Sequence, residues 1–309
     1  MFIIKAIAFV VLLILIDLFA GLFFRYFEKK AMNNNPHGMI AEYTMWQAEA
    51  DIMIFGASEV HHSIIPSLMK AKFNFSTYNC AADGMPFYYQ YCMINSIIDR
   101  KKPKIIIWSV LPYLLKKPTE KQVNALSTLN PFYNSNTYCK NVIDQKSKFE
   151  NLKMLSNLYQ YNSSVVGLMQ NMIVKTKSDN GYLALSNTGY KFPKLDKNSL
   201  FDKQNEVDTN IVNSFVEIIN KCNQSNVQLV LVFAPRHQLN DFSNDNCYRK
   251  LKEIANANEV PFIEKYFSSN IFLSDSTLFK DNAHLNDKGA RLFTNLMSEE
   301  IQQIIITNN

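Results

Sequence analysis

The sequence has few cysteines, and they are not arranged as a metal site or a disulfide framework requires. Its five cysteines include no C-x-x-C pair, and their number is odd. Neither a zinc site nor a complete set of disulfides is therefore predicted, and in an oxidising compartment at least one thiol would be free. The chain also lacks an internal repeat and a low-complexity tract, which excludes repeat architectures.

Dense runs of positive charge are absent as well. The 309 residues carry a formal net charge of +5, but the lysines and arginines are scattered along the chain. No segment is basic enough to follow a phosphate backbone, so nucleic acid is not expected as a partner. With 47% hydrophobic residues, the chain can form one large domain with a full core.

The one long apolar run lies at the N-terminus. Residues 6–24 are apolar except for Asp17 and Gly21, and about 20 such residues cross a bilayer as a helix. A cleavable signal peptide should have a shorter apolar region that ends in small residues, whereas this one ends in Phe-Phe-Arg-Tyr-Phe. We therefore predict a retained membrane anchor over residues 1–30. Asp17 would pair with another membrane helix, lie outside a shifted span, or be tolerated as a single acid.

Behind the anchor, polar residues 31–50 are expected to form a juxtamembrane linker and residues 51–309 an α/β domain. Short apolar runs predict five strands, at 51–56, 74–79, 103–110, 227–233 and 260–263. Helix-like stretches alternate with them at about 64–71, 86–100, 206–224, 245–257 and 286–306. This alternation is typical of a parallel sheet buried on both faces, so the predicted fold is a three-layer α/β/α sandwich.

Residues 112–205 interrupt the alternation. They are rich in Asn, Ser, Lys and Tyr, and they contain one convincing apolar helix, near 152–174. A connection this long predicts a lid, a substrate-binding insertion or a partner surface. Within it, residues 180–191 are either an ordered loop near the site or a turn-rich surface segment.

Candidate catalytic residues follow from the rule that ligands bind outside the carboxyl ends of parallel strands. Ser58 comes directly after the first strand in the segment FGASE, although these letters also suit a helix N-cap. In the segment DNAH, Asp281 precedes His284 by three positions, immediately ahead of the last helix. At that separation a carboxylate can hold one ring nitrogen of the histidine and leave the other to take a proton from a serine.

The order of these motifs resembles the SGNH/GDSL hydrolase superfamily over about residues 50–306. That family carries its nucleophile in a Gly-x-Ser block after the first strand and an Asp-x-x-His before the last helix. The resemblance implies Ser58 as nucleophile, His284 as general base and Asp281 as the acid that orients it. Gly84, in AADGMP, matches the glycine of the second block, whose N–H would join that of Ser58 in an oxyanion hole. No cofactor is expected.

One family feature is missing from the chain. The third block normally supplies an asparagine side chain to the oxyanion hole, but this chain reads WSVLPYLL there. Loss of one such donor typically lowers the rate by about 100- to 1,000-fold. Three interpretations remain: Ser109 or Tyr113 substitutes for it, Asn79 does, or the enzyme is slow or inactive.

Further substrate-binding candidates follow from position alone. Arg236, after the fourth strand, could bind a carboxylate or phosphate with both guanidinium nitrogens, or it is an ordinary surface residue. Glu59, beside the serine, could cap the following helix or contact substrate. His237 and Tyr113 complete this set.

His61 and His62 raise the question of a metal site. Neighbouring residues at the start of a helix are expected to point in different directions, and the sequence offers no obvious second cluster of ligands. No metal site is therefore predicted.

An anchor, a G-[AS]-S-E block and a divergent third block look most similar to the surface-polymer branch of the superfamily. That branch includes the D-alanyl transfer protein of teichoic acid modification and the acetyl-transfer proteins of exopolysaccharide synthesis. It implies a single-pass protein of the inner (cytoplasmic) membrane with its domain facing the periplasm or exterior, although the flanking charges weakly favour a cytoplasmic domain.

The sequence thus predicts a membrane-anchored serine esterase or O-acyltransferase acting on acyl esters, foremost acetyl esters, of a cell-surface polysaccharide. Its partners would be the bilayer, the glycan or acyl-ester substrate, and a multispanning membrane O-acyltransferase. The alternatives are an inactive glycan-binding or scaffold subunit of such a complex, and an intracellular lipid esterase tethered to the inner face.

Overall fold

Five parallel strands form a single sheet in the computed structural model, which describes residues 1–186, 206–237, 242 and 244–307. The strands are β1 (Ile52–Phe55), β2 (Thr77–Asn79), β3 (Ile105–Ser109), β4 (Gln228–Val232) and β5 (Phe262–Ile263). Their order in the sheet is β2-β1-β3-β4-β5, and all neighbours are parallel. Each strand lies within its predicted range, and the predicted α/β fold is confirmed.

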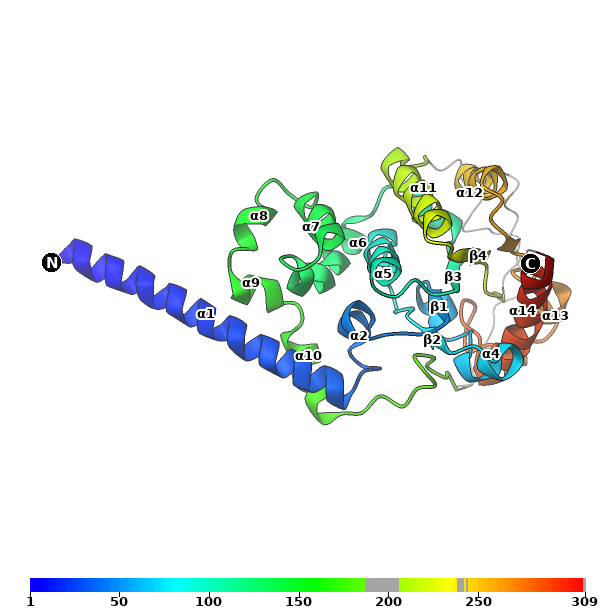
Figure 1. Cartoon of the computed structure of the whole chain (residues 1–309), viewed down its shortest axis with the longest axis horizontal. Coiled ribbons are helices and arrows are strands. Elements are labelled where there is room, and N and C mark those ends of the chain that lie inside the picture. The colour runs from blue at the N-terminus through cyan, green and yellow to red at the C-terminus, as the bar shows by residue number, and fades with distance from the viewer. Residues whose placement is uncertain (187–205, 238–241, 243, 308–309) are drawn as a thin grey trace.

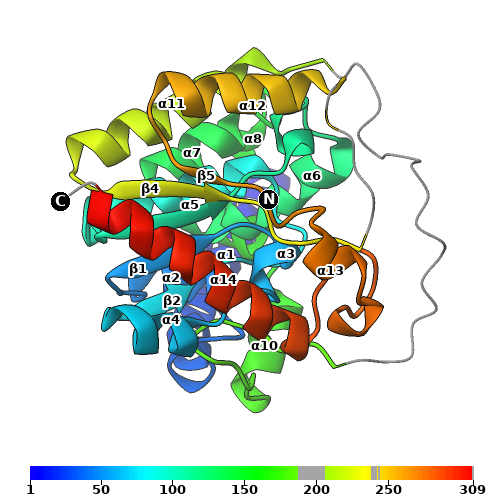
Figure 2. The same cartoon turned by 90° about the vertical axis from the view of Figure 1, so that its right-hand side faces the viewer.

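Helices cover both faces of the sheet and complete three layers (Figure 2). The covering helices are α4 (Pro66–Phe73), α5 (Phe87–Arg100), α11 (Thr209–Gln224), α12 (Asn246–Ala257) and α14 (Asp287–Thr307). Successive strand residues point to opposite faces. Met53 and Phe55 of β1 belong to the core under α5, α11 and α12, whereas Ile52 and Ile54 belong to the core under α4 and α14. Both faces are buried, as the continuous apolar strands predicted.

The insertion between β3 and β4 is helical over most of its described part. It contains η1 (Pro112–Leu115), α6 (Glu120–Ala125), η2 (Leu126–Phe132), α7 (Thr137–Asp144), α8 (Glu150–Lys153), α9 (Asn157–Tyr161) and α10 (Val165–Ile173). The prediction of one helix near 152–174 is wrong, because this stretch is divided among α8, α9 and α10. Ser156 starts α9 anew, since its hydroxyl accepts the N–H of Tyr159.

A long helix, α1 (Phe2–Asn34), projects from the domain (Figure 1). Its 33 residues span about 50 Å, and it is long and apolar enough to cross a membrane. The short helix α2 (Ile40–Trp46) follows, and its Ala41 and Met45 are buried in the same core as α5. Residues 31–50 therefore pack as part of the domain, which differs from the free linker that their polarity predicted.

Candidate active site

Ser58, His284 and Asp281 meet at the carboxyl end of the sheet. Ser58 opens the short helix α3 (Ser58–His61) just after β1, at the point where the chain connections diverge toward β2 and β3. Nε2 of His284 lies 2.8 Å from Oγ of Ser58. On the other side of the ring, Nδ1 of His284 lies 2.9 Å from Oδ1 of Asp281. The three residues thus form the hydrogen-bonded chain that the sequence predicted.

The hydrogen bonds fix the tautomer of His284. A carboxylate can only accept, so Nδ1 carries the proton that is donated to Asp281, and Nε2 is left to accept from the serine hydroxyl. Partial burial would raise the pKa of Asp281, but the hydrogen bond from His284 and the N–H groups of Ala283 and His284 outweigh it and lower this pKa. Asp281 therefore stays ionised in mildly acidic solution.

Several hydrogen bonds fix the loop that carries Asp281 and His284. It follows α13 (Asn270–Leu273) and η3 (Ser276–Leu278), and the Asn286 side chain donates to the carbonyls of Thr277 and Phe279. The N–H of His237 donates to the carbonyl of Asn282. The His237 ring is buried and packs against Phe279. This position supports the loop and differs from the predicted contact with substrate.

Gly56 lets the chain turn sharply from β1 to Ser58. Its φ is +155°, and a Cβ at this position would lie 2.3 Å from Cγ2 of Val60 and 3.0 Å from Cβ of Ser109. A side chain would thus meet both an unfavourable backbone conformation and two close neighbours. The position of the serine depends on glycine here.

Replacing Gly56 with alanine is expected to lower the free energy of unfolding by a few kcal/mol, because strain and overlap add at this turn. Ser58 should also shift from His284, so reaction with a serine-directed probe should fall further than the fraction of unfolded protein explains. Thermal melting and probe labelling of the same sample measure the two effects. Gly167→Ala is the control, since a Cβ there meets nothing within 4 Å. Equal melting temperatures for the two variants would contradict this account.

Two backbone N–H groups are free to bind an oxyanion. Among the described residues, neither the N–H of Ser58 nor that of Gly84 has a hydrogen-bond acceptor. Gly84 has a φ of +69° on an exposed turn, and the space around its Cα is open. These N–H groups are the donors that the sequence predicted for an oxyanion hole.

Two of the three side chains proposed to replace the missing asparagine, Asn79 and Ser109, do not fit that role. Asn79 is fully buried, and its amide donates to the carbonyls of Val60 and Ile64. Ser109 is also fully buried, and its hydroxyl has no hydrogen-bond partner within the described part of the chain. Both predictions are corrected on the same ground, since neither group reaches the surface where a substrate oxygen would bind.

Tyr113 lies near both Glu59, the residue after Ser58, and Arg236. Glu59 is buried, and its Oε1 accepts the N–H of Ala57, which favours the capping role over substrate contact. Burial raises the pKa of Tyr113, and the neighbouring carboxylate of Glu59 raises it further, while Arg236 opposes both. Nε of Arg236 is buried without a hydrogen-bond partner among the described residues. For Tyr113 and Arg236, a role in substrate binding stays a prediction.

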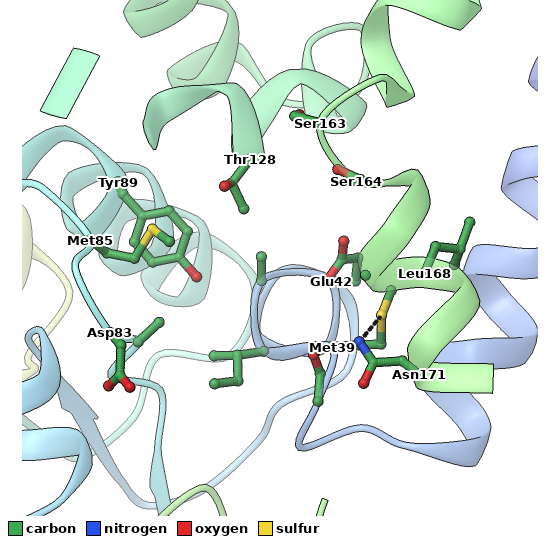
Figure 3. A pocket seen from close by; sticks show the side chains of 15 residues that line it. Met39, Glu42, Asp83, Met85, Tyr89, Thr128, Ser163, Ser164, Leu168 and Asn171 are labelled. Carbon is green, nitrogen blue, oxygen red and sulfur yellow. Dashed lines mark hydrogen bonds between the residues drawn. The ribbon is translucent and has the colours of Figure 1, made fainter. Parts of the chain in front are cut away.

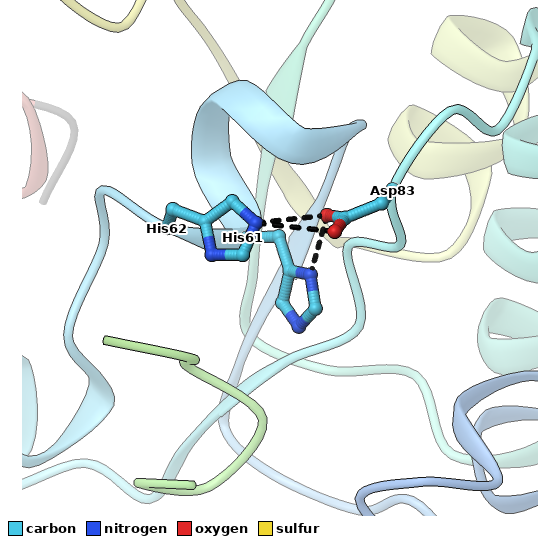
Figure 4. Close-up of side chains that lie close together, drawn as sticks. All are labelled: His61, His62 and Asp83. Carbon is cyan, nitrogen blue, oxygen red and sulfur yellow. Dashed lines mark hydrogen bonds and ion pairs between the residues drawn. The ribbon is translucent and has the colours of Figure 1, made fainter. Parts of the chain in front are cut away.

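His61 and His62 converge on one carboxylate, which sequence reasoning missed (Figure 4). Nδ1 of His61 lies 2.7 Å from Oδ1 of Asp83, and Nε2 of His62 lies 3.2 Å from Oδ2. The expectation that the two rings point apart is therefore wrong. Their convergence could have been inferred, because Asp83 follows β2, the strand next to β1.

This cluster joins the Gly84 turn to the proposed general base. The His62 ring meets the His284 ring edge-to-face, with 5.8 Å between ring centroids. Burial would raise the pKa of Asp83, but His61 and His62 lower it well below its usual range. One ligand atom from each of His61, His62 and Asp83 lies within 4.8 Å of the others, so this set could hold a divalent metal, although hydrogen bonds between the two rings and the carboxylate already satisfy these atoms.

The end of the insertion returns to the site. The carbonyl of Leu183 accepts from Nδ1 of His62 at 2.8 Å, and its N–H donates to the carbonyl of His61. Gly181 has a φ of +92° and passes so close to Asn79 that a Cβ would lie 1.9 Å from that carbonyl oxygen. Of the two alternatives for residues 180–191, the contacts of Gly181 and Leu183 favour an ordered loop near the site over residues 180–186, and residues 187–191 lie outside the described residues.

Comparison with known proteins gives structural likenesses that are distant in sequence. No protein-family model and no curated protein matches the chain. Among solved structures, the chain is similar to a "putative acylhydrolase" from Bacteroides fragilis NCTC 9343. The two share 12% sequence identity and a TM-score of 0.38 over 85% of this chain and 94% of the other. A likeness this distant says nothing about the reaction, which has to be argued from the geometry.

A cavity of about 240 Å³ opens beside the loop after β2 (Figure 3). Asp83 and Met85 line one side of it, α2 contributes Glu42, and the insertion contributes hydroxyl and amide side chains. The polar side chains from the insertion are Thr128, Ser163, Ser164 and Asn171. Because the cavity shares Asp83 with the histidine cluster, it lies next to the proposed oxyanion turn.

Glu42 makes the stability of the fold depend on pH. Burial raises the pKa of its carboxyl to about 7, so the folded chain keeps a proton that the unfolded chain releases at lower pH. Glu42 therefore destabilises the fold progressively as the pH rises from about 4.5 to 7.

We expect Glu42→Gln to raise the free energy of unfolding at pH 8 by on the order of 3 kcal/mol, and to leave it unchanged near pH 4.5. Melting temperatures across this pH range measure the difference. Glu299→Gln is the control, because its carboxylate is mostly exposed. A gain for Glu42→Gln that does not grow with pH would contradict burial as the cause.

Proposed function

We propose that this chain is a membrane-anchored serine esterase or O-acyltransferase that works through an acyl-serine. The observation that carries the proposal is the 2.8 Å contact between Nε2 of His284 and Oγ of Ser58, with Asp281 on the opposite ring nitrogen. A serine hydroxyl is a weak nucleophile unless an adjacent base removes its proton, and this arrangement supplies such a base.

The reaction would proceed in two halves. Oγ of Ser58 attacks the carbonyl carbon of the ester while Nε2 of His284 takes the hydroxyl proton, and the N–H groups of Ser58 and Gly84 stabilise the oxyanion. His284 then gives the proton to the departing alcohol, which leaves the acyl group on the serine. Water or a sugar hydroxyl attacks this acyl-enzyme in the second half, so hydrolysis and transfer differ only in the acceptor.

The proposed substrate is an acyl ester, foremost an acetyl ester, of a cell-surface polysaccharide. The hydroxyl and amide groups around the cavity beside Asp83 are suited to hydrogen bonds with sugar hydroxyls. The site itself is open to solvent, since the side chains of His284 and Asp281 are 25% and 36% exposed. We propose that the domain faces away from the cytoplasm, where such a polymer and a multispanning membrane O-acyltransferase would meet it.

Labelling of the full chain in detergent with a fluorophosphonate tests the proposal. Such a probe reacts covalently with an activated serine, so the wild type should be labelled and His284→Ala should not. His37→Ala is the matched control, because His37 bonds the Tyr78 hydroxyl, whereas the Ser58 hydroxyl bonds His284. If the folded wild type is not labelled, or if both variants label equally, Ser58 is not an activated nucleophile.

A second function, an inactive glycan-binding subunit of an acyltransferase complex, is favoured by one observation. Asn79 and Ser109 are both fully buried, and Asn79 donates to two backbone carbonyls, so neither replaces the asparagine side chain missing from the third block. A labelled wild type that hydrolyses acyl esters would exclude this alternative.

A further inference from the structure

Exposed apolar side chains gather on one part of the insertion. Four large apolar residues in or next to α8 and α9 are each at least 45% exposed: Phe149, Leu152, Leu155 and Leu158. These four residues are called the α8–α9 surface below. A group of large apolar side chains left in solvent marks a site of interaction with a partner or a membrane.

The α8–α9 surface is fixed to the middle of α1. The carboxylate of Asp17 accepts hydrogen bonds from the Ser156 hydroxyl at 2.6 Å and from the N–H groups of Asn157 and Leu158 at 2.9 and 3.0 Å. The side-chain amide of Asn157 adds a fourth hydrogen bond. A Cβ on Gly21 would lie 2.3 Å from Oδ1 of Asn157, so the two helices approach closely. The acid within the apolar run is thus satisfied by α9 of its own chain.

The position of Asp17 in the apolar run of α1 sets the depth of this contact. The run covers residues 6–24 and is about 28 Å long, close to the roughly 30 Å thickness of a bilayer's hydrocarbon core, and Asp17 lies within it. If α1 crosses the membrane, the hydrocarbon has to reach past Asp17, and this brings the bilayer to α9. We propose that the α8–α9 surface inserts into the nearer leaflet of the bilayer, beside α1.

Charge around the α8–α9 surface favours lipid as the occupant. Lys148 and Lys153 flank Leu152, and Glu150 is the one acid between residues 145 and 158. Glu150 is buried, and it accepts from Nζ of Lys153 and from the hydroxyl of Ser147. The exposed charge is therefore positive, which matches anionic phosphate headgroups. The inference rests on the proposed membrane anchor and is independent of the proposed chemistry.

The structure also predicts that exposed apolar residues of the insertion differ in their depth relative to the bilayer. Ile173 of α10 is 85% exposed, but its neighbours Asn171 and Met172 accept hydrogen bonds from Asn34, at the far end of α1. Asn34 lies about 25 Å along the helix axis from Asp17. Ile173 should therefore lie outside the hydrocarbon, even though it is more exposed than any member of the α8–α9 surface.

Fluorescent probes on single cysteines test the inference in the full chain. All five native cysteines are buried, so a thiol-reactive dye should select an introduced one. The variants are Leu155→Cys on the α8–α9 surface, Ile173→Cys on α10, Ile14→Cys in the apolar run of α1 and Ile271→Cys on α13. Ile271 is a matched control, since it is an exposed isoleucine on a helix at the opposite end of the molecule (Figure 1). The protein is reconstituted in phosphatidylcholine vesicles with one quarter phosphatidylglycerol, and nitroxide-labelled lipids serve as quenchers.

We expect the nitroxide lipids to quench the probes at positions 14 and 155 strongly. Quenching of the probe at 173 should be at least several-fold weaker, and the probe at 271 should not be quenched. The inference would be overturned if the probe at position 14 is quenched but the probe at position 155, like the one at 271, is not. The membrane anchor would then still stand. In that case the α8–α9 surface would be free for a protein partner. If the probe at 14 is not quenched, the anchor fails, and the inference fails with it. Fluorophosphonate labelling of the same samples tests the chemistry separately.

Discussion

Replacing Ser58 with alanine is expected to lower ester hydrolysis by about four orders of magnitude or more, because the reaction loses its nucleophile while the base and the oxyanion donors remain. Hydrolysis of a small chromogenic acetyl ester by the full chain in detergent measures the loss. The hydroxyl of Ser58 bonds only to His284 among the described residues, so its removal should leave the melting temperature nearly unchanged.

Ser67→Ala is the matched control for this prediction. Ser67 lies in the first turn of α4, is exposed and donates to Asp179, so its loss should not affect hydrolysis. A Ser58→Ala protein that keeps more than about a hundredth of the wild-type rate would show that another group carries the reaction. Water activated directly by His284 would then be the next candidate.

Replacing Asp281 with asparagine is expected to lower kcat by about 1,000- to 10,000-fold with little change in KM. The asparagine amide can donate to Nδ1 of His284, and the proton then moves to Nε2. A ring in that tautomer cannot accept the serine proton, although the site keeps its shape. Steady-state kinetics of the variant separate this effect from a loss of substrate binding.

Asp275→Asn provides the control for the change from acid to amide. Asp275 caps η3 by accepting the N–H of Thr277, six positions before Asp281 in the same loop region. This variant should lose some stability and keep its kcat. Equal losses of kcat in the two variants would show that the loop responds to any change of charge, and that Asp281 has no special role in orienting His284.

The sheet could be predicted because its residues depend mainly on burial. Continuous apolar runs such as 105–109 have one stable arrangement, between two layers of helices, and the structure has them there. The insertion could not be predicted as well, because its short helices depend on local caps. The Ser156 hydroxyl ends one helical stretch and starts another, and an apolar periodicity continues through both.

The juxtaposition of Ser58 and His284 could be predicted from the order of the motifs and the resemblance they carry, because the loops that follow parallel strands lie at one edge of the sheet. Which way the side chains beside them point could not. Asn79 turns inward to two carbonyls, and His61 and His62 turn toward Asp83. The orientation of each of these side chains depends on which backbone polar groups lack a partner nearby, and this is known only once the chain is folded.

The pairing of Asp17 with α9 bears on how the protein should be prepared. A shortened chain that begins at residue 31 is the natural choice for a soluble sample. It would remove the acceptor of the Ser156 hydroxyl, the aromatic ring of Phe24 that stacks on Tyr161, and the carboxylate of Glu28 that accepts from the Tyr161 hydroxyl. Truncation before residue 31 would thus uncover a packed interface, and poor solubility of such a fragment would reflect the cut instead of a property of the α/β domain.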